Sequence, residues 1–278
     1  MNCLACGEPL SPRIGDAVTH ASCLMVEPVE DESNSFSEIL RHQLTEIILW
    51  NTARAPRSLQ REIGPSEIGS PCDRQIAYRV ANVNEVNTKQ DPWAAVIGTA
   101  IHRWLQEGVH DWVEDQGVRD RYFTELELDL LGGLIRGHCD LYDAESQTVI
   151  DWKTVGPNAL KDVEAGRIST GYMIQTHLYG YMFAQQNIPV KRVALVFIPR
   201  ASSLNRLRVW SAVYDETVAL TALNRVYRIA QQVMDHDLLN QSHLWAQVPA
   251  EGGDHCGFCP WFEAHRVAPA DATGCPGR

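Results

Sequence analysis

Hydrophobic residues recur at two different spacings along this chain. Recurrence every three to four positions predicts helices over residues 36–50, 92–115, 172–186 and 217–239. Alternation of hydrophobic and polar positions predicts strands over residues 122–130, 134–142, 148–155, 192–199 and 207–214. Short turns join the first three strands, which favours an antiparallel meander. The mixture of periods indicates an α/β (α+β) domain.

The helix over residues 92–115 carries a hydrophobic face that we expect to point inward. Val96, Ala100 and Trp104 follow one another on this face at helical spacing, with Ile97, Ile101 and Leu105 beside them. This face is therefore predicted to pack on the meander.

Composition divides the chain into four segments. Residues 1–28 are turn-rich and contain cysteine pairs, and residues 29–60 form an acidic linker and helix. Residues 61–248 form the α/β core. Residues 249–278 are rich in Gly, Pro and Cys with little periodicity, so we expect a ligand shared with Cys72, in place of a hydrophobic core, to order this tail.

Composition and charge narrow the functional classes. The 278 residues are 45% hydrophobic and 21% charged, as in ordinary globular proteins. No apolar run approaches the length of a membrane span and the chain start lacks a signal-peptide pattern, so we expect no membrane association and a cytoplasmic location. The net charge of −11 would argue against a nucleic-acid partner if it were spread evenly along the chain. Much of the negative charge lies in residues 1–40, so the rest of the chain is closer to neutral. Of the 24 basic residues 20 are Arg, a side chain that suits phosphate contacts.

Two aspartates and a lysine are predicted to meet on the meander. If residues 134–142 and 148–155 pair about a turn centred between positions 145 and 146, Asp140 faces Asp151 directly. Lys153 projects from the same face, and the carbonyl of Trp152 lies beside it. Opposed carboxylates favour a divalent cation such as magnesium or manganese between them. The alternative is a solvated hairpin whose acidic residues happen to align.

Four short motifs resemble those of RecB-like exonucleases in the PD-(D/E)xK superfamily, over roughly residues 60–278. They are Gly98-Thr99-Ala100-Ile101-His102 with Glu107, Gly137-His138-Cys139-Asp140, Ile150-Asp151-Trp152-Lys153-Thr154, and Gln175-Thr176-His177-Leu178-Tyr179. The resemblance implies a restriction-endonuclease-like core with a mixed central sheet flanked by helices.

The same resemblance implies roles for individual residues. His102, Asp140, Asp151 and the carbonyl of Trp152 would hold the cation, and Lys153 would stabilise charge at the phosphate. Gln175 and Tyr179 would line the site near DNA. Either Glu125 or Glu127 would supply a further acid from the preceding strand.

Eight cysteines in a chain without a signal sequence indicate metal chemistry more than disulfides. Cys72 with Cys256, Cys259 and Cys275 is similar to the cysteine layout of iron–sulfur nucleases, including the CRISPR-associated exonucleases and the AddB subunit, and implies a 4Fe-4S cluster. His265 is an alternative fourth ligand and zinc an alternative metal. Cys139 is left over, as a small core residue.

The amino-terminal segment has the spacing of a structural zinc site. Cys3, Cys6, His20 and Cys23 form two pairs thirteen residues apart. A segment this short needs such a ligand to fold, and the alternative is a disordered tail with reactive thiols. We expect this module to contact a recombination or replication protein, or the substrate.

These expectations combine into a stand-alone DNA exonuclease acting on single strands or DNA ends. No phosphate-binding loop of a motor protein occurs in the sequence. Recombination, repair or CRISPR adaptation, in a bacterial or phage-infected cytoplasm, fits the resemblance. Two alternatives stay open: a structure-specific endonuclease on the same core, and a non-catalytic DNA-binding or assembly module.

Overall fold

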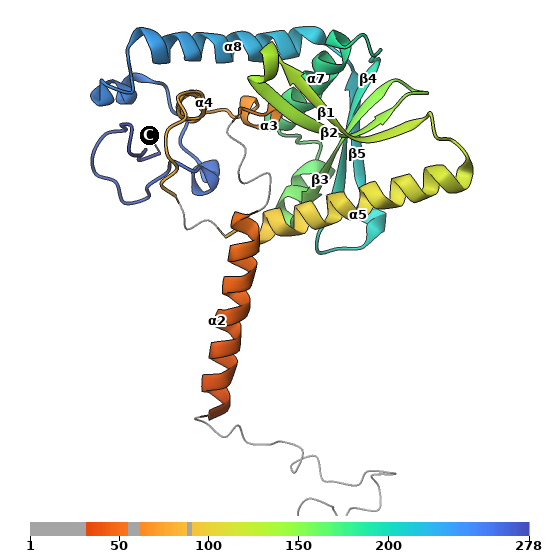
Figure 1. Ribbon diagram of the computed structural model, residues 1–278, viewed down its shortest axis with the longest axis horizontal. Coiled ribbons are helices and arrows are strands. Elements are labelled where there is room, and N and C mark those ends of the chain that lie inside the picture. The colour runs from red at the N-terminus through yellow and green to blue at the C-terminus, as the bar shows by residue number, and fades with distance from the viewer. Residues whose placement is uncertain (1–31, 55–61, 88–90, 278) are drawn as a thin grey trace, which may run out of the picture. The chain divides into compact units, whose positions relative to one another are not determined.

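The computed structural model describes residues 32–54, 62–87 and 91–277, and the chain divides into two compact units, residues 1–59 and 60–278 (Figure 1). In the first unit the described part is the helix α2 (Glu32–Ala53), which includes the helix expected over 36–50. The predicted zinc ligands Cys3, Cys6, His20 and Cys23 lie outside the described residues. None of the helices within the described ranges is long and apolar enough to traverse a bilayer.

The second unit contains the predicted long helices and strands, each within a few residues of its expected bounds. The helices are α3 (Pro65–Ile68), α4 (Asp73–Val80), α5 (Trp93–Gln116), α6 (Pro157–Glu164), α7 (Thr170–Gln185) and α8 (Glu216–Asp235). The strands are β1 (Tyr122–Leu130), β2 (Ile135–Asp143), β3 (Thr148–Val155), β4 (Arg192–Pro199) and β5 (Arg208–Val213). Short 3-10 turns are η2 (Leu131–Gly133), η3 (Leu204–Arg206), η4 (Ser242–Gln247) and η5 (Asp254–Phe258). The helices α3, α4 and α6 were not predicted from the sequence, because they are too short to show a clear hydrophobic period.

The five strands form one mixed sheet in the order β1-β2-β3-β4-β5 (Figure 1). The first three strands are an antiparallel meander, β4 runs parallel to β3, and β5 returns antiparallel to β4. Leu141 pairs with Ile150, which confirms the predicted register between β2 and β3. The ladder ends at this pair, so Asp140 and Asp151 are the first residues of the two strands beyond the paired positions.

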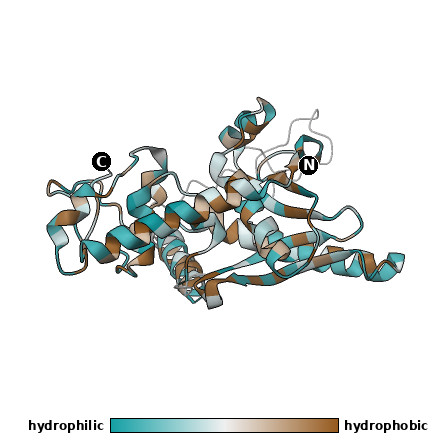
Figure 2. Cartoon of the chain, turned by 90° about the horizontal axis from the view of Figure 1, so that it is seen from above, coloured by the Kyte–Doolittle hydropathy of each residue, from teal (hydrophilic) through white to brown (hydrophobic). Residues whose placement is uncertain are grey.

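Helices flank the sheet, and the hydrophobic core lies between them and the sheet. The helix α7 packs against β1, β3 and β4, and α8 packs on α7. Figure 2 shows hydrophobic and hydrophilic residues mixed along the helices. On α8 the buried residues Ala219, Ala222, Val226 and Ile229 recur every three to four positions, as in an amphipathic helix. A close backbone approach fixes the start of α7: a Cβ on Gly69 would lie 2.5 Å from the carbonyl oxygen of Gly171. Both positions need glycine for that reason.

The predicted inward face of α5 is wrong in part. Ala100 is exposed and Trp104 is 70% exposed, whereas Gly98, His102 and Val113 face the sheet. A Cβ on Gly98 would stand 3.2 Å from Thr154 Oγ1, so the helix comes very close to β3 there. The hydrophobic pattern did not identify the inward face of α5, because that face carries a glycine and a polar histidine next to the carboxylates.

The carboxy-terminal segment packs into the main hydrophobic core of the second unit, which corrects the expectation that a ligand orders it in place of such a core. Trp261 and Trp245 are buried, and both rings stack on Tyr78 of α4, with ring centroids 5.5 and 4.3 Å away. Trp261 Nε1 donates to the carbonyl of Val83 at 3.1 Å. The backbone N–H of Cys275 donates to Trp261 at 2.8 Å, which pins the last residues to this stack.

Candidate active site

Three potential metal ligands from three elements converge beside the sheet. His102 on α5, Glu125 on β1 and Asp140 on β2 bring one ligand atom each to within 4.8 Å of one another. His102 Nδ1 lies 3.1 Å from Asp140 Oδ1. Within the described ranges this is the one such group of His, Cys, Asp and Glu side chains. The structure thus brings His102 and Asp140 of the motifs together with Glu125, one of the two glutamates that could supply a further acid.

Of the two glutamates that could supply a further acid, Glu125 is the one that lies at the site. It has a φ of +51°, a left-handed conformation that is rare for a residue with a side chain. Glu127, two residues along β1, is exposed and aligned with His138. Strained backbone of this kind often occurs where a side chain must reach a functional site. The unusual conformation at Glu125 departs from the simple strand alternation that the sequence analysis assumed.

The two aspartates are held by different partners. Asp140 Oδ2 accepts a hydrogen bond of 2.6 Å from the backbone N–H of Trp152. Asp151 is only 2% exposed, and its Oδ1 accepts from Gln175 Nε2 at 3.0 Å. Asp151 Oδ2 is buried and forms an ion pair with Lys153 Nζ at 2.7 Å, so the two carboxylate oxygens of Asp151 have different partners.

The titration of the site follows from burial and crowding of charge. Burial raises the pKa of Asp151 to about 6, assisted by the charge of Asp140 and opposed by Lys153. Burial alone would lower the pKa of His102, but its hydrogen bond to Asp140 and the nearby carboxylate charges outweigh burial and raise it. A divalent cation would neutralise the negative charge of these crowded carboxylates.

Gln175 and Tyr179 lie next to the aspartates, as the motif spacing predicted. Lys153 Nζ donates to Gln175 Oε1 at 2.8 Å, so Gln175 bridges the lysine and Asp151. Burial, together with the charges of Asp151 and Asp140, raises the pKa of the Tyr179 hydroxyl well above its usual value, so it stays protonated. A Cβ on Gly137 would lie 3.0 Å from the Tyr179 ring, which explains why this motif begins with glycine.

Trp152 holds two residues of the site in place, Asp140 through its backbone N–H and His102 through its ring. Its N–H orders Asp140, and its buried ring meets His102 edge-on with centroids 5.9 Å apart. The side chains that could hold a cation are those of His102, Glu125 and Asp140. Asp151, which the motif predicts as a further ligand with the carbonyl of Trp152, is bound to Lys153 and Gln175 in this structure. This mixed carboxylate and imidazole set suits magnesium or manganese.

The four predicted cluster cysteines line one small cavity in the carboxy-terminal segment. Cys72, Cys256, Cys259 and Cys275 share it with His255. No three of these described sulfur atoms come within 4.8 Å of one another. His265 is exposed and does not line this cavity. Cys139 is fully buried in the core of the sheet, as expected of a small core residue.

His255 is a residue that the sequence analysis did not single out as a ligand. Its Nε2 is buried and has no hydrogen-bond partner among the described residues. Only its position directly before Cys256 could have signalled a role in this cavity.

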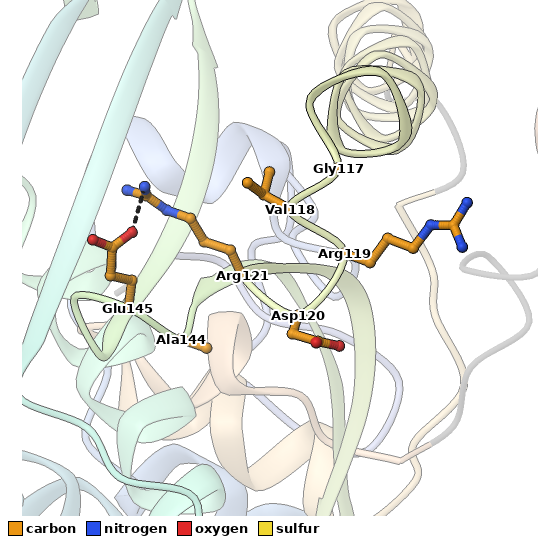
Figure 3. Close-up of a pocket in the computed structure, with 7 residues that line it drawn as sticks. All are labelled: Gly117, Val118, Arg119, Asp120, Arg121, Ala144 and Glu145. Atoms are coloured by element: carbon orange, nitrogen blue, oxygen red, sulfur yellow. Dashed lines mark ion pairs between the residues drawn. The ribbon is translucent and has the colours of Figure 1, made fainter.

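A hollow at the end of α5 lies apart from this chemistry. It is open and shallow, with a volume of about 360 Å³, and its lining residues are Gly117, Val118, Arg119, Asp120, Arg121, Ala144 and Glu145 (Figure 3). Arg121 forms ion pairs with Asp143 and Glu145 there. None of the motif residues lines it, so it is not the candidate active site.

Comparison with solved structures gives only weak similarities. An alkaline exonuclease from Laribacter hongkongensis has 11% identity and a TM-score of 0.45, covering 65% of this chain and 92% of its own. A phage-related exonuclease from Haemophilus somnus 129PT has 14% identity and a TM-score of 0.36, covering 65% and 96%. The protein SSO0001 has 15% identity and a TM-score of 0.45, covering 82% and 97%. No curated protein matches the sequence.

A family model matches the part of the chain that contains most residues of the site. The model of the PD-(D/E)XK nuclease superfamily matches residues 107–264, which is more than half of the chain and includes Asp140, Asp151, Lys153, Gln175 and Tyr179. The five-stranded mixed sheet agrees with such a core. This chain therefore belongs to the PD-(D/E)XK nuclease superfamily.

Proposed function

We propose that this chain is a divalent-metal-dependent deoxyribonuclease that works as an exonuclease on single strands or DNA ends. The observation that carries the proposal is the convergence of Asp140, Asp151 and Lys153 at the end of the β2–β3 ladder. His102 and Glu125 lie within ligand distance of Asp140. A solvated hairpin would not bury Asp151 to 2% exposure, so that alternative is disfavoured.

Each residue has a separate task in this proposal. His102, Glu125, Asp140, Asp151 and the Trp152 carbonyl hold magnesium or manganese, which supplies charge neutralisation at the phosphate and an activated water. The observation that fits such an ion is the approach of one imidazole and two carboxylates, those of His102, Glu125 and Asp140, to within 4.8 Å of one another.

The remaining motif residues act without binding the ion. Lys153 places a positive charge where the phosphate oxygens become more negative. Gln175 orients both Lys153 and Asp151 through its two amide atoms. Tyr179 stays protonated and offers its hydroxyl as a donor near the DNA.

Whether the enzyme is an exonuclease or an endonuclease can be tested independently of its metal dependence. An exonuclease needs a free end, whereas a structure-specific endonuclease on the same core would open a closed circle. Incubation with circular and linear single-stranded DNA of one sequence, in magnesium, separates the two. We expect loss of the linear substrate and an intact circle. Cleavage of the circle at an equal rate would instead support the endonuclease.

The cysteine cavity supports a second part of the proposal, an iron–sulfur cluster held by Cys72, Cys256, Cys259 and Cys275. Burial, with the nearby charges of the other three cysteines, raises the pKa of Cys259 to about 11. Four thiolates could not share this cavity without a metal centre to balance their charge.

Zinc and a four-iron cluster would hold these four sulfur atoms at different distances from one another. Tetrahedral zinc with bonds of about 2.3 Å would draw its sulfurs to within ~4 Å of one another. A four-iron cluster takes one thiolate at each iron and holds them further apart. The four sulfurs line one cavity together with His255, whose Nε2 is buried, and metal analysis of the purified protein distinguishes the two metals.

The remaining parts of the proposal rest on sequence. Residues 1–28 would bind one zinc through Cys3, Cys6, His20 and Cys23, and would contact a recombination or replication protein. A cytoplasmic role in recombination, repair or CRISPR adaptation, in a bacterium or a phage-infected cell, is the setting that we propose. A non-catalytic assembly module is the competing class, and intact Asp140, Asp151 and Lys153 argue against it.

A further inference from the structure

The ammonium group of Lys153 has three close neighbours in this structure. Nζ lies 2.7 Å from Asp151 Oδ2 and donates to Gln175 Oε1 at 2.8 Å. The third neighbour is the ring of Tyr172, whose centroid is 4.8 Å from Nζ. A cation within about 6 Å of an aromatic centroid is attracted by the face of the ring. Tyr172 is not part of any motif that the sequence analysis recognised.

The first two neighbours are also committed to the candidate metal site. Asp151 is one of the proposed metal ligands, and Gln175 donates to the same carboxylate through Nε2 at 3.0 Å. A divalent cation on Asp151 would compete with the ammonium for its negative charge and would repel the ammonium. The attraction of the uncharged Tyr172 ring for Lys153 does not depend on that carboxylate. The ring is thus the neighbour that retains its hold when the site is loaded.

The surrounding fold keeps the Tyr172 ring in place. Tyr172 lies in the first turn of α7, directly after Gly171, whose close approach to Gly69 fixes the start of the helix. Its ring also lies 6.3 Å from the ring of Phe197, a buried residue of β4. Tyr172 itself is 36% exposed, so its side chain can be changed without opening a large core cavity.

We propose that Tyr172 is a positioning residue that holds the Lys153 ammonium toward the scissile phosphate by a cation–π contact. The inference rests on the proposed nuclease function. It requires the aromatic ring of Tyr172 and does not require its hydroxyl. It also assigns the effect to the chemical step, because Lys153 acts on charge that develops at the phosphate.

Steady-state cleavage of a 5′-fluorescein-labelled oligonucleotide in magnesium tests this inference. Tyr172→Phe is expected to keep kcat within about twofold of wild type, whereas Tyr172→Leu lowers kcat about tenfold with KM nearly unchanged, which is the loss expected of a partly desolvated cation–π contact. Equal loss in the Phe and Leu variants would contradict a role for the ring. A rise in KM with unchanged kcat would show instead that Tyr172 stacks on a nucleobase, and would also overturn the inference.

Matched controls separate this inference from folding and from the proposed function. Tyr227→Leu makes the same change at a 62% exposed tyrosine of α8 and is expected to leave kcat unchanged. The thermal midpoint of Tyr172→Leu is expected to match that of Tyr172→Phe, and a lower kcat in a folded Leu variant then reflects positioning. If Lys153→Ala keeps wild-type cleavage, the proposed function itself fails. If Lys153→Ala is inactive and Tyr172→Leu is fully active, only the positioning role fails.

Discussion

The carboxylate of Asp140 accepts a hydrogen bond of 2.6 Å from the backbone N–H of Trp152, at the point where the β2–β3 ladder ends. A side chain thus takes up a backbone donor near the end of the ladder. The contact ties Asp140 to the segment that carries Asp151 and Lys153 on either side of Trp152. It therefore sets the relative positions of the three residues on which the proposed chemistry depends.

Glu125 is expected to act as a metal ligand although it lies outside the sequence motifs. Glu125→Gln removes one charged oxygen within 4.8 Å of His102 and Asp140 and should raise the manganese concentration for half-maximal activity by about tenfold or more. The matched control is Glu127→Gln at the exposed neighbouring glutamate, which should leave the metal dependence unchanged. Identical metal titrations for both variants would remove Glu125 from the site.

The sequence carried enough information for the meander and for its register. The alternation in residues 134–142 and 148–155, with a polar turn between them, placed Leu141 opposite Ile150 as observed. The inward face of α5 could not be predicted from hydrophobicity, because Gly98 and His102 face the sheet while Trp104 is exposed. Where a helix serves a polar site, its inward face ceases to be the most apolar one.

Long-range packing explains the other differences. The stacking of Trp245 and Trp261 on Tyr78 joins residues more than 160 positions apart, and no local period signals such a contact. The choice of Glu125 depends on a left-handed backbone conformation, which propensity assigns mainly to glycine and asparagine. By contrast, Gln175 and Tyr179 lay on one helical face as their spacing required.

The buried charge of Asp151 predicts how the metal-free protein responds to pH. Its pKa of about 6 lies above the unfolded value of 3.8, so the folded state binds more protons between these two values. The free energy of unfolding therefore falls as pH rises from about 4 to above 6. In EDTA, Asp151→Asn should raise the thermal midpoint by a few degrees at pH 8 and much less at pH 4.5. A variant that is less stable than wild type at pH 8 would contradict this view of Asp151.

The cysteine cavity predicts a coloured protein. Anaerobic purification should give broad absorbance near ~400 nm from an iron–sulfur cluster, lost together with thermal stability in Cys72→Ala and Cys256→Ala. Cys139→Ala should retain the colour, because Cys139 lies in the core of the sheet. Cys275→Ala should bleach the protein and His265→Ala should not, since only Cys275 lines the cavity. Colourless protein that holds zinc at these cysteines would overturn the iron assignment.

Residues 1–28 are expected to be separable from catalysis. Their deletion should release one zinc per chain, because Cys3, Cys6, His20 and Cys23 have structural-zinc spacing. Cleavage of short oligonucleotides should continue, since every residue of the candidate active site lies beyond position 100. Metal analysis and a cleavage assay on the truncated protein check both parts. A folded but inactive truncation would make the module part of the active site.

Metal-dependent cleavage by purified protein tests the central claim most directly. End-labelled single- and double-stranded DNA would be incubated with wild type, Asp151→Ala and Lys153→Ala, in magnesium, manganese or EDTA. The account predicts degradation by wild type only with metal, and cleavage more than about a thousandfold slower in both variants, with the fold and DNA binding retained. Variants that stay within about tenfold of wild type, a barrier change of only ~1.4 kcal/mol, would contradict it.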